Sequence, residues 1–315
     1  MLRRFLTLTI SLAVLLVSCS QAPSETPTLK LGLLPVLEAL PVYVADSKGY
    51  FKSEGISVEF VPVASAAERD QLMQAGQIDG MINDLVSTVL YNKDTQKIAV
   101  VRFARLATPS SAQYSILAAK GSGITKPADL KGVEVGISEG TVIAYVTDRL
   151  LEAEGLQPGD IKTTNIIKIS DRMQLLDQGQ LKAATLPDPF STLALQNGAT
   201  VVVDDRTHTD LGNSEWSFSV NTLKTKPNTV KKFLSALEKA INDINASPSQ
   251  YNSVLIDKKL IPTPLAGKYT LPHFPAASVP TEAQFNDVQT WMISKGLLQT
   301  ALPYSKLVDS SFLPK

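Results

Sequence analysis

Residues 29–63 read LKLGLLPVLEALPVYVADSKGYFKSEGISVEFVPV, and this stretch decides the fold. Its first apolar run, 29–34, stops at Pro35, which predicts a short buried strand rather than a helix. Pro41 suits the first turn of a helix, where its missing N–H costs nothing, and Gly49 suits the end of that helix.

A second strand follows over residues 56–63, which are rich in β-branched side chains. A strand–helix–strand unit of this length is a right-handed crossover in a parallel sheet. Ligands of such sheets bind beyond the carboxyl ends of the strands. The loop 35–40 lies at such an end, so functional groups are expected in loops and not on a helix face.

The rest of the chain continues the alternation of strands and helices. Ser65 with Glu68 predicts a capping box at a helix start, and Ser170 predicts another cap. Further strands are predicted over 79–82, 98–106, 114–119, 133–137, 162–169, 183–186, 200–203 and 216–220. A later helix from Lys226 is predicted to carry an apolar stripe, and a helix over 281–295 is predicted to begin with a second capping box, Thr281 to Gln284. This order predicts an α/β protein of two lobes, each an open, mostly parallel sheet flanked by helices.

Two crossings between the lobes are expected, near residues 106–114 and 204–216. The predicted lobes are therefore 29–109 plus 207–315 for lobe 1 and 110–206 for lobe 2. A ligand cleft between the lobes follows from this arrangement.

Charge and composition exclude nucleic-acid binding as a function. The 315 residues include 30 Lys+Arg and 30 Asp+Glu, so no field of one sign attracts a polyanion. Hydrophobic residues make up 44% and charged residues 19%, which is the balance of a globular protein.

The N-terminus resembles a bacterial export signal. Arg3 and Arg4 form a basic start, and residues 6–17 form an apolar core too short to span a bilayer comfortably. The tetrapeptide LVSC, which ends at Cys19, resembles the lipobox, in which the cysteine is lipidated and becomes the new N-terminus. The alternatives are a plain secretory signal with a chance cysteine and an uncleaved anchor.

We therefore expect a signal peptide over 1–18, a lipidated Cys19 and a polar, Pro-containing tether over 19–28. Cys19 is the only cysteine, so neither an internal disulfide nor a cysteine-based metal site is expected. No metal and no cofactor are predicted. The protein is expected to be exported and anchored through lipid to the outer face or periplasmic side of the bacterial cell membrane.

Several motifs together resemble one known family. Residues 45–56 read ADSKGYFKSEGI, 127–132 read PADLKG, Gly140-Thr141 opens a helix, and 291–297 read WMISKGL. Over about residues 29–312 the chain resembles solute-binding proteins of ABC importers, in the nitrate/sulfonate/taurine and thiamine-pyrimidine-precursor group. The resemblance implies a type II periplasmic-binding-protein fold, whose two lobes close over a small ligand and present it to a permease and ATPase complex. It implies a binding protein rather than an enzyme, and we expect a monomer.

The candidate ligand-binding residues of lobe 1 follow its strands. Glu38 lies in the loop after the first strand, and the alternative is a solvated loop acid. Ser65 is a helix cap whose neighbouring N–H groups could face a ligand. Asn83 and Asp84 end a short strand and are placed to read donors on a ligand, with helix capping as the alternative.

In lobe 2 the candidates are Ser138, Gly140 and Thr141, at the start of a helix where N–H groups and hydroxyls gather. In the sulfonate binders this stretch holds the acidic head group, but Glu139 weakens the case for an anion here. Asp188 stands between two prolines, where relatives often carry a ligand contact, and a turn-forming Asp is the alternative.

The candidate residues favour a ligand that donates hydrogen bonds. They include four acids, with Glu139 counted, but no Arg or Lys, whereas a sulfonate or nitrate needs cationic or N–H donors. A thiamine-pyrimidine precursor, a riboflavin-like compound or an amine is therefore preferred over a sulfonate, taurine or nitrate. Arg69, Arg102 and Arg105 are the cations that would reverse this preference if they reach the cleft.

Two other function classes stay open. Residues 136–140 read GISEG, which matches the nucleophile elbow of serine esterases, with Ser138 as nucleophile and His208 and His273 downstream. Against an esterase, no oxyanion segment of the HGGG type precedes the motif. The synthases that share the implied fold use cysteine-rich motifs, which a single cysteine does not supply. A ligand-sensing domain for a membrane receptor is the third reading.

Overall fold

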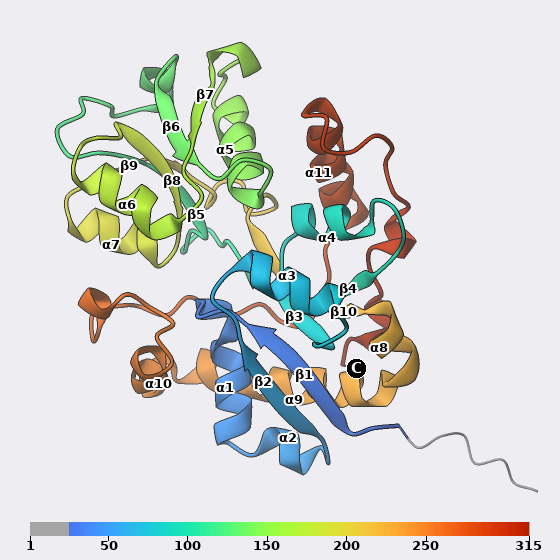
Figure 1. Ribbon diagram of the computed structural model, residues 1–315. Coiled ribbons are helices and arrows are strands. Elements are labelled where there is room, and N and C mark those ends of the chain that lie inside the picture. The colour runs from blue at the N-terminus through green and yellow to red at the C-terminus, as the bar shows by residue number, and fades with distance from the viewer. Residues whose placement is uncertain (1–24, 315) are drawn as a thin grey trace, which may run out of the picture.

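The computed structural model describes residues 25–314, which form two lobes, each built on a five-stranded sheet (Figure 1). The predicted signal peptide, Cys19 and most of the tether lie outside the described residues. In the first sheet the strand order is β2-β1-β3-β10-β4. Its strands are β1 (Thr28–Leu33), β2 (Ser57–Pro62), β3 (Gly80–Asn83), β4 (Ile98–Leu106) and β10 (Asn213–Ser219).

The second sheet has the order β7-β6-β8-β5-β9. Its strands are β5 (Tyr114–Ala118), β6 (Glu134–Ile137), β7 (Lys162–Asn165), β8 (Ala183–Pro187) and β9 (Thr200–Asp204). In each sheet three neighbouring strands run parallel, and the fourth in the order, β10 or β5, runs antiparallel to both of its neighbours. The predicted α/β fold with two mostly parallel sheets is therefore confirmed.

Both antiparallel strands are the ones that the chain enters after a crossing. Residues 107–113 lead from β4 to β5, and residues 205–212 lead from β9 to β10. Asp205 ties the two crossings together, because its carboxylate accepts hydrogen bonds from Gln113 N at 2.9 Å and Tyr114 N at 3.0 Å. The residue-level lobe boundaries given above stay a prediction.

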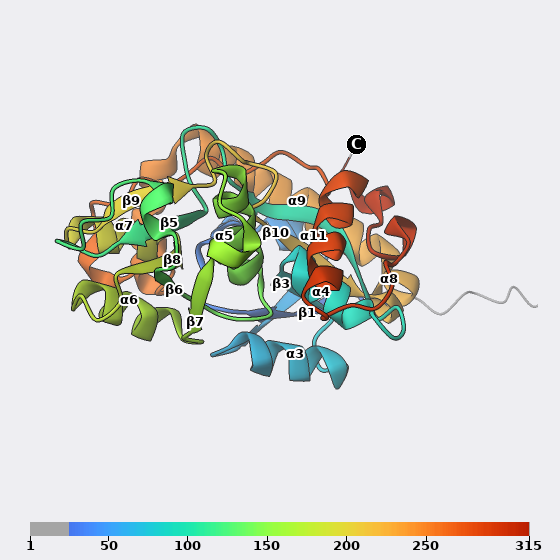
Figure 2. The ribbon, with the colours of Figure 1, turned by 90° about the horizontal axis from the view of Figure 1, so that it is seen from above.

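Helices cover both sheets. Those of the first sheet are α1 (Leu40–Ser47), α2 (Tyr50–Ser53), α3 (Ala66–Gln74), α4 (Leu85–Asn92), α8 (Val220–Thr225), α9 (Pro227–Ala246) and α10 (Asn252–Asp257). Those of the second sheet are α5 (Val142–Ala153), α6 (Ile169–Asp177) and α7 (Phe190–Gln196), and α11 (Glu282–Ser294) packs beside α4 (Figure 2). No helix of residues 25–314 combines the length and the apolar character that a membrane span needs.

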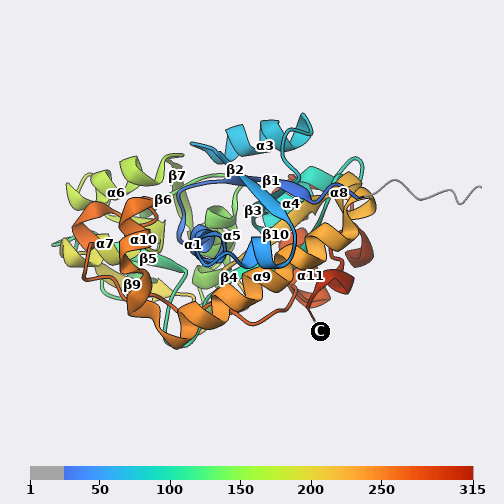
Figure 3. The same cartoon turned by 90° about the horizontal axis from the view of Figure 1, so that it is seen from below.

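The core of the first lobe centres on α9, which runs beneath the sheet next to α1 (Figure 3). The apolar stripe predicted for this helix is buried: Val230, Phe233, Leu234, Leu237, Ile241 and Ile244. The Phe233 ring stacks on Phe51 and meets Trp216 edge to face, with ring centroids 5.7 and 5.2 Å apart. Amphipathic periodicity thus set the orientation of this helix.

The two lobes repeat one local arrangement of an arginine over a glycine. Arg69 of α3 lies over Gly32 of β1 and donates to Ile82 O at 2.8 Å. Arg172 of α6 lies over Gly136 of β6 and donates to Thr185 O at 3.0 Å. An added Cβ on Gly136 would lie 3.2 Å from Arg172 Cγ, which is tight, whereas one on Gly32 would lie 3.6 Å from Arg69 Cγ, which is an ordinary contact.

The prediction was wrong where β7 meets α6. The strand ends at Asn165 rather than at residue 169, and the helix begins at Ile169 after Lys168, so Ser170 is not its cap. The run IIKI, which is rich in β-branched residues, suggested a longer strand. In the structure the Ile166 carbonyl accepts a hydrogen bond from Arg172 Nη1 at 2.7 Å instead of from a neighbouring strand.

Of the two predicted capping boxes, only the one at α11 is complete. Thr281 Oγ1 accepts from Gln284 N at 3.2 Å, and Gln284 Oε1 accepts from Thr281 N at 2.9 Å. At α3, Ser65 Oγ accepts from Glu68 N, but the Glu68 carboxylate accepts from Ala64 N instead of Ser65 N.

Candidate functional site

Loops at the carboxyl ends of the strands of both lobes enclose a cavity of about 240 Å³. It lies where the sequence placed the cleft, beyond β1 and β3 of one sheet and β8 of the other. Most of its wall is apolar and comes from both lobes: Leu34, Pro35, Val36, Leu37, Ile82, Val142, Ile143, Ile169, Pro187, Pro189, Phe190 and Leu260. A small flat molecule with an apolar body fits such a wall.

Glu38 brings a carboxylate to this cavity. It sits in a single 3-10 turn, Leu37–Ala39, that follows β1 and buries its two neighbours. Its Oε1 lies 3.4 Å from Gln113 Nε2 and 3.5 Å from Ser214 Oγ, at the long limit of a hydrogen bond. Burial raises the pKa of Glu38, and the Arg105 guanidinium opposes that rise only in part. The side chain is thus an acceptor that the protein itself engages weakly.

Asp84 brings the second carboxylate. It caps α4 by accepting from Ser87 N at 2.8 Å through Oδ1, and it lines the cavity as well. Burial raises its pKa, against the opposing effects of the Ser87 N–H and the Arg69 charge. The capping alternative for this residue is therefore confirmed, and its role in ligand binding stays a prediction.

Asn83 lines the same wall, but its amide is occupied by the protein. Its Nδ2 donates to Thr88 Oγ1 at 2.9 Å, and its Oδ1 accepts from Ser217 Oγ at 2.7 Å. The side chain fixes the end of β3 against α4 and β10. Both ends of the Asn83 amide are therefore engaged by other side chains of the protein.

Asp188 also lines the cavity, and its carboxylate is occupied too. Oδ2 accepts from Arg105 Nη2 at 2.8 Å and from the Tyr269 hydroxyl, while Oδ1 accepts from Thr192 Oγ1 at 2.5 Å. Asp188 N donates to Gln113 O at 2.9 Å.

The remaining predicted residues lie at the helix starts. Thr141 caps α5 by accepting from Ile143 N at 3.2 Å, and with Gly140 it lines a neighbouring pocket of about 390 Å³. Asp84 and Arg69 line both this pocket and the cavity, so the two spaces adjoin. Ser65 and Ser138 lie outside both; the Ser138 carbonyl accepts from Thr141 Oγ1 at 2.7 Å.

Two buried residues next to the cavity were missed by the sequence reasoning. Tyr114 begins β5 and lines the cavity, and burial, followed by the charge of Asp84, raises its pKa well above the usual value. Glu215 of β10 is fully buried, and neither of its carboxyl oxygens has a partner among residues 25–314. Burial and then Asp84 raise the pKa of Glu215 well above its usual range, because both disfavour the ionised carboxylate. The sequence signal that could have identified Glu215 is an acidic residue within an otherwise uncharged strand, NSEWSFS.

The cations near the cavity are paired with protein groups. Arg69 is the one cationic residue in the cavity wall, and its guanidinium binds Asp70 at 2.7 Å and Ile82 O at 2.8 Å. Arg105 is bound to Asp188, and Arg102 pairs with Glu238 at 2.7 Å in lobe 1. Within residues 25–314 no cluster of His, Cys, Asp and Glu has the arrangement of a metal site.

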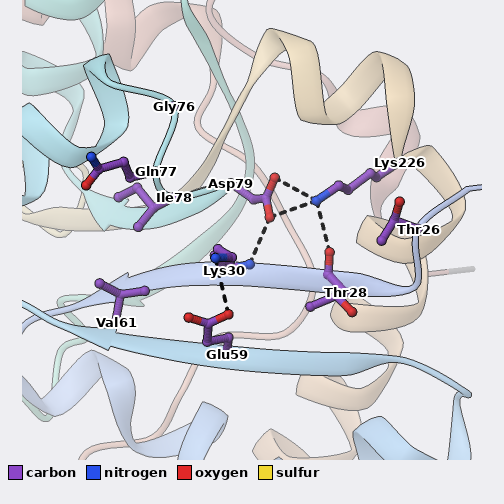
Figure 4. A pocket seen from close by; sticks show the side chains of 10 residues that line it. All are labelled: Thr26, Thr28, Lys30, Glu59, Val61, Gly76, Gln77, Ile78, Asp79 and Lys226. Carbon is purple, nitrogen blue, oxygen red and sulfur yellow. Dashed lines mark hydrogen bonds and ion pairs between the residues drawn. The ribbon is translucent and has the colours of Figure 1, made fainter.

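A larger space of about 660 Å³ lies at the opposite end of β1, away from the cleft (Figure 4). Its charged groups satisfy one another, because Lys226 pairs with Asp79 at 3.0 Å and Lys30 pairs with Glu59 at 3.4 Å. Asp79 also accepts from Lys30 N at 2.8 Å, so this cluster joins β1 to β3 and α9. Its role is structural.

The esterase reading finds no geometric support in the described part of the chain. Ser138 follows β6 as the motif requires, but no hydrogen bond joins its hydroxyl to His208 or His273 in residues 25–314. Neither histidine lines the cavity. A nucleophile needs its base within hydrogen-bond reach.

Comparisons with known proteins give a consistent family. The model of the NMT1/THI5-like family matches residues 37–251, more than half of the chain. A thiamine biosynthesis protein of Haemophilus influenzae is 26% identical over 270 residues, which cover 83% of this chain and 84% of that protein.

Two further relatives differ in what their names say they do. The 4-amino-5-hydroxymethyl-2-methylpyrimidine phosphate synthase THI11 of Saccharomyces cerevisiae is 24% identical over 258 residues, covering 74% of this chain and 71% of that protein. The crystal structure of the periplasmic aliphatic sulphonate binding protein SsuA of Escherichia coli superposes with a TM-score of 0.76 at 19% identity, covering 90% of this chain and 92% of that one. The fold predicted from the sequence, that of periplasmic binding proteins, is thereby confirmed.

Proposed function

Because this chain belongs to the NMT1/THI5-like family, we propose that it is the solute-binding component of an ABC importer. Its cavity lies between two lobes and is built from loops of both, as a capture site requires. Closure over the ligand selects the form that a permease and ATPase complex recognises. The sulphonate-binding structure that shares the fold is named as periplasmic, which supports export of this chain. The lipid on Cys19 rests on the tetrapeptide LVSC alone.

The ligand is a small heterocycle or amine that carries N–H donors, with a pyrimidine precursor of thiamine preferred. The observation behind this proposal is that Glu38 and Asp84 face the cavity, whereas Arg69, the cation of its wall, is already paired. An oxyanion there would meet two acids and no free cation, while amino groups find acceptors. The apolar walls suit the faces of an aromatic ring.

A synthase is the competing function, because the yeast relative is named as one. The synthases of this fold are expected to use cysteine-rich motifs, and this sequence has a single cysteine, Cys19. That residue is predicted to begin the tether that follows the signal peptide, far in sequence from the cavity residues. A binding role therefore needs only the residues that line the cavity, whereas a synthase of this type would need further cysteines.

The function is tested by thermal shift with 4-amino-5-hydroxymethyl-2-methylpyrimidine, riboflavin, polyamines, taurine, alkanesulfonates and nitrate. At about 100 times Kd, a ligand stabilises the protein by roughly 2.7 kcal/mol. We expect stabilisation by the aminopyrimidine and recovery of it unchanged by mass spectrometry. Stabilisation by taurine or a sulfonate alone would contradict the ligand class, and a converted product would establish an enzyme.

Glu38→Gln and Asp84→Asn test the two acceptors. Each replacement keeps the shape but removes a charge-assisted hydrogen bond of about 1.5–3 kcal/mol, so affinity for the aminopyrimidine should fall roughly 10- to 100-fold. Glu59→Gln is the matched control, because Glu59 is exposed on β2 and pairs with Lys30 far from the cavity. Equal affinity of all three variants would show that the ligand binds elsewhere.

A further inference from the structure

The Asp188 carboxylate joins the two lobes beside the cavity. Arg105 reaches it from β4 of the first sheet, just before the first crossing. Tyr269 reaches it from the segment between α10 and α11, and Thr192 from α7 of the second lobe. The Asp188 and Arg105 side chains are 8% and 1% exposed, so this is a buried ion pair.

The same contacts leave Asp188 little to offer a ligand. Both carboxylate oxygens accept from protein donors, and the backbone N–H and carbonyl bind Gln113 O and Arg105 Nη1 at 2.9 and 3.3 Å. Its neighbours Pro187, Pro189 and Phe190 nevertheless form part of the cavity wall. Asp188 therefore acts on a ligand through the loop that it holds.

We propose that Tyr269 and Arg105 are positioning residues that hold the loop 187–190 against the cavity and keep the lobes closed. The proposal rests on the proposed binding function for its ligand readout, but lobe closure itself is measurable without a ligand. Burial disfavours the charged form of Arg105, yet Asp188, Tyr269 and Glu38 outweigh that effect and raise its pKa. The charged Arg105 guanidinium thus holds the Asp188 carboxylate in place through their ion pair.

The two donors differ in what lobe movement does to them. Arg105 also donates to Ala112 O at 3.3 Å, inside the crossing, where a rotation of the lobes displaces atoms least. Tyr269 belongs to a segment that returns to lobe 1 and contacts Asp188 of lobe 2, so its bond must break when the lobes separate. Tyr269 is therefore the latch, the residue whose bond holds the lobes closed. Arg105 fixes the loop at the crossing between the lobes.

Tyr269→Phe tests the latch, with Tyr50→Phe as its matched control. Both replacements remove a tyrosine hydroxyl that donates to a carboxylate, but Tyr50 binds Asp243 within lobe 1, whereas Tyr269 binds Asp188 across the lobes. We expect ligand-free Tyr269→Phe to show a larger radius of gyration by small-angle X-ray scattering, and Tyr50→Phe to match the wild type. With 4-amino-5-hydroxymethyl-2-methylpyrimidine as probe, dissociation should be about tenfold faster, with little change in association.

The outcomes separate this proposal from the binding function. If the probe does not bind, the radius of gyration still decides whether Tyr269 closes the lobes. A radius of gyration and a dissociation rate equal to those of Tyr50→Phe would overturn the proposal. Thr192→Val, which removes a donor to Asp188 from the same lobe, should leave the radius of gyration unchanged; an equal expansion there would mean general loosening of the loop.

Discussion

At the scale of single residues, Asp205 shows how a buried acid holds the hinge. Its carboxylate accepts from the backbone of Gln113 and Tyr114, and it packs so closely on Gly212 that an added Cβ there would lie 2.0 Å from Oδ2. Burial is the largest effect on this group, and it raises the pKa of Asp205 to about 7 despite the two N–H donors.

The protein should therefore lose stability as the pH rises. Asp205 has a folded pKa of about 7 against 3.8 for the free group, so its contribution is full below about pH 4 and is lost as the pH rises through 7. Burial raises the pKa values of Glu38, Asp84 and Glu215 as well, which acts in the same direction. Calorimetry should give a lower Tm at pH 8 than at pH 5.

Asp205→Asn provides the control for this pH dependence. The variant should have a lower Tm at both pH values, because the Asn amide cannot accept both backbone N–H bonds. The difference between its Tm at pH 5 and its Tm at pH 8 should be smaller than in the wild type. An unchanged difference would assign the pH effect to the other buried acids.

Sequence reasoning placed several cavity residues but not their partners. Glu38, Asp84 and Asp188 follow strands, so their location at the carboxyl edge of a sheet was predictable. Which of the predicted side chains are already bonded to other protein groups was not predictable from the sequence. Ser217, the partner of Asn83, is 134 positions away, and Tyr269, a partner of Asp188, is 81 positions away. Such contacts depend on the packing of segments that no local pattern relates.

At the scale of elements, the arginine and glycine pairs of the two lobes allow the packing around Gly32 and Gly136 to be compared. A Cβ on Gly32 would lie 2.7 Å from Ile78 Cδ1, and one on Gly136 would lie 2.8 Å from Leu181 Cδ1. At both sites the end of an apolar side chain would have to move to admit a Cβ, and at Gly136 the Arg172 stem adds a second tight contact.

Gly32→Ala and Gly136→Ala should each destabilise the protein by about 1–3 kcal/mol through overpacking, read as a lower urea midpoint. Gly159→Ala is the matched control, since nothing lies within 4 Å of an added Cβ there. The control should be neutral or slightly stabilising. A loss at Gly159 equal to that at Gly136 would mean that packing is not the cause.

Most elements could be predicted because several local signals agree on them. Strand β4 has the predicted bounds, and α11 begins after Thr281 with the predicted capping box. The error at β7 and α6 arose where β-branched residues favour a strand, while the Ile166 carbonyl accepts a hydrogen bond from the Arg172 side chain of the following helix.

At the scale of the whole molecule, α11 joins the lobes through residues other than those of the Asp188 cluster. Asp287 accepts from Tyr145 Oη at 2.7 Å and Arg149 Nε at 3.0 Å, both on α5. Trp291 Nε1 donates to Asp148 Oδ2 at 2.8 Å in the same interface. The helix also packs on α4 of lobe 1, so α4, α5 and α11 form one block (Figure 2).

Hydrogen exchange should show this block as one unit. Asp287→Ala removes contacts of a half-exposed side chain worth about 1 kcal/mol, so amides of α5 and α11 should exchange roughly fivefold faster together. Asp177→Ala, which removes only an exposed contact with Asn197 in lobe 2, should leave α11 unchanged. Faster exchange confined to α11 would show that the two helices open independently.

The order of the strands along the chain also dictates when each lobe is able to form. All five strands of the second sheet lie within residues 114–204, whereas the first sheet lacks its fourth strand until residues 213–219 emerge during synthesis. Until then β3 and β4 present unpaired edges, the kind of surface on which partly made chains aggregate. The second sheet can therefore be completed during synthesis before the first, although the first sheet contains the earliest-made strands, β1 and β2.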